Sequence, residues 1–241
     1  AYQSTESPYY DWYTFHGSRD RYDSWWGIDT LPAIKESSHS YQNFMFSEDG
    51  VIKHWLRHGI GGYRLDVADE LPGFFLKMLR KAAKTQDPDA VIIGEVWEDA
   101  SNKIAYGERR EYFQGEELDS VMNYPLKDAV INFLLSGNTS RLREVIAMLI
   151  DHYPKQTLDS LMNHLGTHDT ARILTVLGGK SCQSKEEMSM THLTEAEKAA
   201  AKDLLKMGAV IQFTLPGVPC IYYGDEIGME GYSDPFCRGC F

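Results

Sequence analysis

The sequence lacks several features that would point to particular classes of protein. It has no run of 18 or more apolar residues, and its first ten residues, AYQSTESPYY, have neither a basic stretch nor an apolar core. A membrane span and a secretory signal peptide are therefore not expected within it. Positive charge is also in short supply, because 24 Lys and Arg face 35 Asp and Glu, for a formal net charge of -11. This balance argues against nucleic acid as a partner.

Cysteine is scarce as well. Only four are present, Cys182, Cys220, Cys237 and Cys240, among 241 residues. The last two form a CRGC, a spacing found in metal knuckles and redox pairs, but no second CxxC and no paired histidines accompany it. We interpret them as plain thiols. Unpaired cysteines favour the cytoplasm as the location, with secretion as the alternative.

The chain has no internal repeat, and residues 1–45 have no sustained periodicity, so we expect irregular loops there. From residue 46 onward, short runs of β-branched or aromatic residues alternate with helical patterns. Strands are expected near residues 61–67, 91–95, 119–122, 160–165 and 218–223, and helices near 47–58, 73–86, 126–135, 140–153 and 194–215. This alternation is typical of a parallel α/β sheet. The Thr194…Glu197 pair predicts a capping box at the start of the last helix.

Carboxylates stand at the ends of four of these expected strands. They are Asp66, Glu95, Asp169 and the pair Asp225-Glu226. Because the carboxyl ends of parallel strands lie on the same side, these acids are expected to converge on one rim. An acid after a strand can instead cap the following helix, and we prefer that interpretation for Asp69 and Glu70.

The segment GGYRLDVADE sets Arg64 and Asp66 two positions apart in a strand, so both side chains point to the same face. A guanidinium beside a carboxylate stabilises its charged form, which suits a nucleophile. Glu95 follows an apolar strand and lies near Trp97, a setting that favours the protonated form and suits a proton donor. Such a pair of carboxyl groups, roughly 5 Å apart, would cleave a glycoside with retention of configuration.

Four segments together carry a resemblance. GGYRLDVADE, IIGEVWEDA, LGTHDT and GVPCIYYGDEIGM, in this order, resemble consecutive signature segments of glycoside hydrolase family 13, the α-amylase superfamily. The residues of the segments GYRLDVADELP and GEVWEDASNKI are most similar to the neopullulanase, cyclomaltodextrinase and pullulanase-like branch of this family. The resemblance implies a (β/α)8 TIM barrel and a glycosidase that hydrolyses α-1,4 and in some cases α-1,6 bonds of α-glucans such as maltooligosaccharides, cyclodextrins, pullulan or starch.

The resemblance also implies a role for each site residue. Asp66 would be the nucleophile, Glu95 the general acid and base, and Asp169 the stabiliser of the distorted sugar. Three further residues would bind substrate: Arg64, which would also position the nucleophile, His168 and Trp97. No metal ligand is implied within this chain, although calcium could bind in a longer parent protein.

The sequence departs from the family pattern at its start. No DxxxNH segment, which the family carries at the end of its third strand, is present, and Leu31 to Lys35 (LPAIK) resembles the end of the family's inserted domain B. The resemblance therefore predicts two parts. Residues 1–45 would be the last part of the inserted domain B, and residues 46–241 would be the C-terminal part of the catalytic barrel, with strands 4 to 8. Such a piece is expected to be inactive alone, and a homodimer could cover its exposed barrel edges.

Other functions stay open at this point. An α-glucan transglycosylase of the same superfamily would share every catalytic residue. A noncatalytic glucan-binding barrel fragment is an alternative from a different class; the intact acids at 66, 95 and 169 argue against decay of the parent protein, but not against inactivity of this piece. A metal-dependent hydrolase fits least, because no HxH or HExxH ligand cluster appears.

Overall fold

The computed structural model describes all 241 residues, and its centre is a row of five short parallel strands. They are β3 (Gly62–Leu65), β4 (Val91–Gly94), β7 (Ser120–Val121), β8 (Met162–Asn163) and β9 (Val218–Pro219). β3 pairs with β4, β4 with β7, and β8 with β9, and a parallel bridge between Met122 and Met162 joins the two groups. The strands thus follow one another in chain order, as consecutive strands of a (β/α) barrel do.

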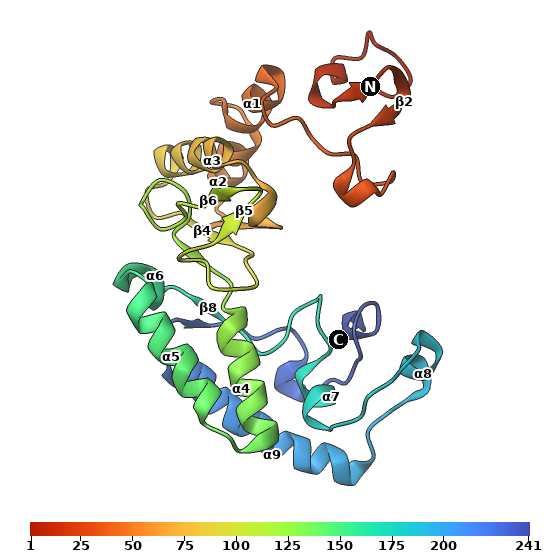
Figure 1. Cartoon of the computed structure of the whole chain (residues 1–241), viewed down its shortest axis with the longest axis vertical. Helices are drawn as coiled ribbons and strands as arrows, with labels where there is room; N and C mark the ends of the chain where they lie inside the picture. The colour runs from red at the N-terminus through yellow and green to blue at the C-terminus, as the bar shows by residue number, and fades with distance from the viewer.

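Helices occupy three of the four connections between these strands, and two more helices precede β3 (Figure 1); a short hairpin takes the place of a helix between β4 and β7. The helices are α1 (His39–Phe46), α2 (Val51–Arg57), α3 (Gly73–Gln86), α4 (Tyr124–Ser136), α5 (Ser140–His152), α6 (Lys155–Asp159), α7 (Ile173–Leu177), α8 (Lys185–Met190) and α9 (Glu195–Thr214). The predicted capping box is confirmed, because the Thr194 hydroxyl accepts from the Glu197 N–H while the Glu197 carboxylate accepts from the Thr194 N–H. The parallel strands and the helices between them confirm the predicted α/β class.

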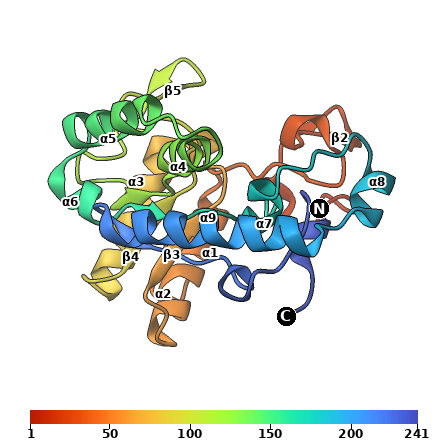
Figure 2. The same cartoon turned by 90° about the horizontal axis from the view of Figure 1, so that it is seen from below.

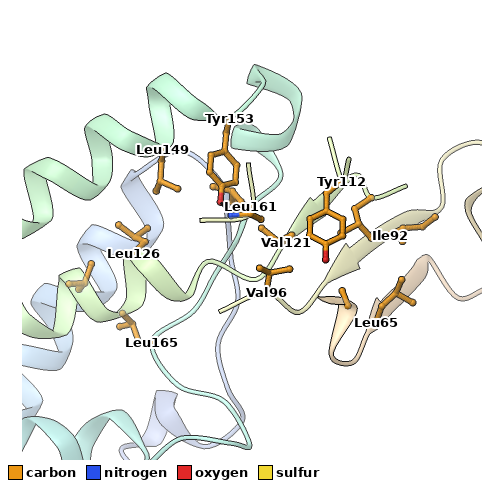
Figure 3. Packing of buried hydrophobic residues seen from close by; sticks show 14 of the residues in the cluster. Leu65, Ile92, Val96, Tyr112, Val121, Leu126, Leu149, Tyr153, Leu161 and Leu165 are labelled. Atoms are coloured by element: carbon orange, nitrogen blue, oxygen red, sulfur yellow. Dashed lines mark hydrogen bonds between the residues drawn. The ribbon is translucent and has the colours of Figure 1, made fainter. Parts of the chain in front are cut away.

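One continuous hydrophobic core runs between the strands and the helices. Figure 3 shows Leu65, Ile92 and Val121 from the strands next to Tyr112, and Leu126, Leu149 and Leu161 further along the same cluster. Leu65, Ile92 and Val121 are buried, whereas Val91 and Val218, the first residues of β4 and β9, stay exposed.

Residues 1–45 were expected to be irregular loops, and this prediction is wrong in part. They contain an antiparallel hairpin, β1 (Phe15–His16) with β2 (Ser18–Tyr22), and the start of α1. Aromatic contacts hold the region together: Tyr10 stacks on Phe15 with ring centroids 4.6 Å apart, and Trp12 packs against residues of α1. Such contacts leave no periodic signal. A second unpredicted hairpin joins β5 (Ile104–Ala105) and β6 (Glu108–Arg109).

The row of strands is open at both ends. β3 has a strand partner only in β4, and β9 only in β8, so the two do not meet to close a barrel. Figure 1 shows the strands and helices arranged as an arc, with the N-terminal segment apart from α4, α5 and α9, and Figure 2 shows α9 running along the underside of the molecule. No helix of the chain is both long and apolar enough to cross a membrane. The division into a domain B segment and a barrel segment stays a prediction.

Candidate active site

Arg64 is the residue that joins the two carboxylates expected to do the chemistry. One nitrogen of its guanidinium, Nη1, contacts Oδ1 of Asp66, and the other, Nη2, lies 3.0 Å from Oε1 of Glu95. The same-face prediction for Arg64 and Asp66 is thereby confirmed. The carboxylates differ in exposure, since the side chain of Asp66 is 74% exposed and that of Glu95 only 6%. One group can be approached from solvent, while the other is held within the protein.

An ion pair and two hydrogen bonds hold the Glu95 carboxylate. Besides Arg64, the Trp97 indole donates from Nε1 to Oε1 at 3.2 Å, and the Val67 backbone N–H donates to Oε2 at 2.9 Å. Val67 reaches it from the left-handed region, with φ of 45° and ψ of 53°, which is strained for a β-branched residue. The turn directly after Asp66 therefore aims its N–H group at Glu95.

His168 and Asp169 follow β8. His168 Nε2 lies 3.1 Å from Asp169 Oδ2, and the guanidinium of Arg238 lies 3.4 Å from Asp169 Oδ1. Arg238 also donates from Nε to the His168 carbonyl at 3.1 Å and pairs with Asp234 at 2.6 Å. The sequence reading missed Arg238, because it lies inside the CRGC segment, where only the thiols drew attention. All four cysteines are free, and the Cys237 thiol is 3.2 Å from the His168 carbonyl oxygen.

A hollow of about 770 Å³ brings the predicted residues together. Five of the six predicted site residues line it, and Arg64 contacts two of these five. The predicted residues in its lining are Asp66, Glu95, Trp97, His168 and Asp169. Residues that the sequence reading did not assign to the site line it too, among them Trp26, Glu70, Lys103, Tyr106 and Arg238.

Asp69 and Glu70 do not cap α3, so the capping interpretation is wrong. The N-cap of α3 is Pro72, which has no side-chain cap hydrogen bond. Asp69 instead accepts a hydrogen bond of 2.7 Å from the Tyr112 hydroxyl and pairs with Lys103 at 3.0 Å. Glu70 accepts a hydrogen bond from the indole of Trp26. Both carboxylates connect separate loops around the hollow.

The expectation that Asp225 and Glu226 join the same rim is also wrong, because neither lines the hollow. Asp225 is buried and lies 3.2 Å from Nη1 of the fully buried Arg172, which donates as well to the Tyr223 carbonyl at 2.6 Å. Burial raises the pKa of Asp225 to about 6, and the charge of Arg172 opposes this rise. Asp225 and Arg172 therefore form a buried ion pair outside the hollow.

A metal centre finds no support in the side-chain arrangement. No group of three or more His, Cys, Asp or Glu residues is placed where it could hold a metal ion. Lone acid pairs occur, but structural metal sites require more ligands. Calcium in a longer parent protein stays a prediction.

The fold is an open row of parallel strands of the (β/α) barrel kind, and two neighbouring strands bring a pair of carboxylates together at their ends. Residues 2–236 match the family described as the alpha amylase catalytic domain, and the chain belongs to this family. An amylopullulanase of Thermoanaerobacter thermohydrosulfuricus is 36% identical over 98% of the chain and 17% of that protein. Neopullulanase 2 of Thermoactinomyces vulgaris is 33% identical over 92% of the chain and 36% of that protein.

Solved structures agree with this assignment. The cyclic α-maltosyl-(1→6)-maltose hydrolase of Arthrobacter globiformis in complex with maltose superposes with a TM-score of 0.80 at 26% identity, over 99% of this chain and 49% of that one. The type III pullulan hydrolase of Thermococcus kodakarensis superposes with a TM-score of 0.78 at 29% identity, over 95% of this chain and 38% of that one. The chain thus spans less than half of each of these proteins, and the predicted barrel class is confirmed for the part that it contains.

Proposed function

We propose that this chain supplies the catalytic carboxylates of a retaining glycoside hydrolase that acts on α-glucosidic bonds of α-glucans. The observation that carries the proposal is the contact of one guanidinium, that of Arg64, with both Asp66 and Glu95. A retaining hydrolase needs two carboxyl groups close together with different protonation states. The shared guanidinium places the two carboxyl groups close together, and the exposure of Asp66 leaves it open to a sugar.

In the proposed mechanism, Asp66 is the nucleophile and Glu95 the general acid and base. Glu95 gives its proton to the glycosidic oxygen as the carboxylate of Asp66 attacks the sugar's anomeric carbon, the bond to the leaving glucan breaks, and a glycosyl ester forms on Asp66. Glu95 then takes a proton from water, the water oxygen attacks the same carbon, and Asp66 is released as a carboxylate. The exposure of Asp66 supports its role, since the attacking group must reach the sugar.

The remaining residues would bind the sugar. Asp169, which is held by His168 and Arg238, is proposed to contact the hydroxyls of the sugar undergoing cleavage. Trp97, half exposed beside Glu95, is proposed to border the leaving portion of the glucan. Flat aromatic faces are suited to contact with the apolar faces of sugar rings.

Maltooligosaccharides, cyclodextrins and pullulan are the proposed substrates. The relatives named amylopullulanase and neopullulanase, and the maltose complex of the Arthrobacter globiformis hydrolase, support α-glucans as the substrate class. We propose α-1,4 bonds as the main target and α-1,6 bonds as a second one. A cytoplasmic location is proposed as well, which the four free cysteines support.

The chain is proposed to need further barrel strands for activity, because β3 and β9 each have a free edge. These edges could be covered by additional sequence or by a second copy of the chain in a homodimer. The test compares the 241-residue chain with an extended protein that includes native sequence on both sides. We expect hydrolysis of maltotriose, cyclodextrin or pullulan by the extended protein and none by the 241-residue chain as a monomer. Hydrolysis by the 241-residue chain as a monomer would refute this part of the proposal.

The test of the nucleophile is Asp66→Asn in the extended protein. We expect turnover to fall by a factor of about 10³ or more while maltooligosaccharide binding is kept, because the amide is similar in size but cannot form the ester. A fluorinated glycosyl fluoride followed by peptide mapping should place the covalent sugar on Asp66. Asp49→Asn, an exposed acid beside α2, is the matched control and should leave turnover unchanged. A label on Glu95 would overturn the assignment of roles.

A further inference from the structure

Three residues other than glycine have a positive φ, and all three line the hollow around Asp66. They are Trp26 at 50°, Val67 at 45° and Tyr106 at 53°. They come from three segments that are far apart in the sequence. Bulky residues are rarely found in the left-handed region, and strained backbone of this kind gathers at ligand-binding sites. Val67 is explained by its hydrogen bond to Glu95, but Trp26 and Tyr106 do not contact the catalytic groups.

Trp26 presents a large exposed ring in a fixed position. Its side chain is 74% exposed, yet the indole donates from Nε1 to Oε1 of Glu70 at 2.8 Å. The ring also stacks on Trp25, with centroids 4.8 Å apart and planes 13° apart. One edge and one face of the ring are therefore held, which leaves its other face free for a ligand. A freely rotating surface tryptophan would have neither restraint.

Tyr106 faces the same carboxylate from the turn of the β5–β6 hairpin. It is 73% exposed and is followed by Gly107, also at positive φ, so the turn projects the ring beyond the hairpin. Desolvation first, and then the negative charge of Glu70, raises the pKa of the Tyr106 hydroxyl, so Glu70 lies near both aromatic residues. Glu70 thus connects the loop that carries Trp26 with the hairpin turn that carries Tyr106.

We propose that Trp26 and Tyr106 form an aromatic clamp that positions the leaving portion of the glucan. This proposal rests on the proposed function. Glu95 must face the glycosidic oxygen, and the segment that continues from Glu95 through Trp97 leads to the hairpin that carries Tyr106. Asp169 and its partner Arg238 contact neither aromatic residue through a hydrogen bond and come from the chain after β8. Two exposed aromatic faces can contact successive sugar rings through their apolar faces, and the restraints on Trp26 reduce the entropy lost on binding.

The first experiment compares two substrates in the extended protein. Maltohexaose places several glucose units beyond the cleaved bond, whereas α-maltosyl fluoride places only fluoride there. For Trp26→Ala and Tyr106→Ala, we expect kcat/KM for maltohexaose to fall about tenfold more than kcat/KM for α-maltosyl fluoride, mainly through KM. Trp55→Ala removes an exposed tryptophan on α2, outside the hollow, and should change neither value. Equal losses on both substrates would refute the clamp.

A second measurement separates this proposal from the proposed function. Maltohexaose binding is measured by calorimetry in an Asp66→Asn background, where no turnover is required. We expect Trp26→Ala and Tyr106→Ala each to weaken binding about tenfold, and Trp26→Phe to retain most of it. Unchanged affinity in both alanine variants would refute the clamp even if the enzyme is a glucan hydrolase. A different outcome is maltohexaose binding that depends on both residues, together with no labelling of Asp66 by the fluorinated glycosyl fluoride in the protein with its native Asp66. This outcome would support the clamp and refute the proposed hydrolase function.

Discussion

Gly62 should be a position where a single methyl group disrupts both the fold and the site. Its φ is 151°, and it pairs with Val91 on β4. A Cβ atom there would lie 2.0 Å from the Val91 carbonyl oxygen and 2.6 Å from the Val91 nitrogen. These are backbone atoms, which cannot rotate away. Gly61→Ala is a matched control, because nothing lies within 4 Å of the Cβ position at Gly61.

The cost of Gly62→Ala follows from these distances. Ordinary contact begins near 3.4 Å, so β3 must move away from β4 by more than 1 Å, which disrupts the 2.9 Å hydrogen bond from the Val91 N–H to the Gly61 carbonyl. A lost backbone hydrogen bond costs about 1 kcal/mol, and an unfavourable backbone conformation about 1–3 kcal/mol. We expect a total of about 2–4 kcal/mol, against less than about 1 kcal/mol for Gly61→Ala.

Urea unfolding followed by circular dichroism measures this difference. Activity of the extended protein should fall as well, because β3 leads into Asp66 and β4 into Glu95, and a displacement of about 1 Å can lower a rate about a hundredfold. If Gly62→Ala lies within about 1 kcal/mol of Gly61→Ala, close packing of β3 on β4 does not limit stability and the reasoning fails.

Two further predictions concern stability. Thr194→Ala removes the capping hydrogen bond to the Glu197 N–H at 3.3 Å and should lower the free energy of unfolding by about 1 kcal/mol in the same urea assay, whereas Thr194→Ser should retain it. Asp225 has its pKa raised to about 6, so the folded state keeps its proton longer than the unfolded state does and stability should fall as pH rises from about 4 to about 6. Asp225→Asn should remove that contribution to the pH dependence, and an unchanged profile in thermal unfolding scans would contradict the assignment.

The parallel sheet was predictable because its strands are apolar runs separated by helical patterns. All five strand positions are confirmed, although every strand is shorter than predicted; the last covers 218–219 in place of 218–223 and the fourth 162–163 in place of 160–165. The single helix expected at 47–58 is α2 alone, and the end of α1 precedes it. The chain turns at Gly50, where a Cβ would lie 2.8 Å from the Met45 carbonyl oxygen. Periodicity does not report such a backbone contact.

The candidate site was predictable only in part, for a related reason. Arg64, Asp66 and Glu95 lie at the ends of adjacent strands, so strand geometry brings them together. Trp26 reaches Glu70 across 44 positions of sequence, and Arg238 reaches Asp169 across 69. No local pattern records those contacts. The roles assigned to the site residues stay predictions until they are tested.

The guanidinium of Arg64 has a consequence for the charge of the site during turnover. Before attack, the proposed mechanism has a negative Asp66, a protonated Glu95 and a positive Arg64. In the glycosyl ester, Asp66 is neutral and Glu95 has lost its proton, so the sum of the three charges is again zero. Arg64 touches both carboxylates and can balance whichever one is negative. The reaction can thus be electroneutral within this trio, and no ion has to enter a half-buried site between the two steps.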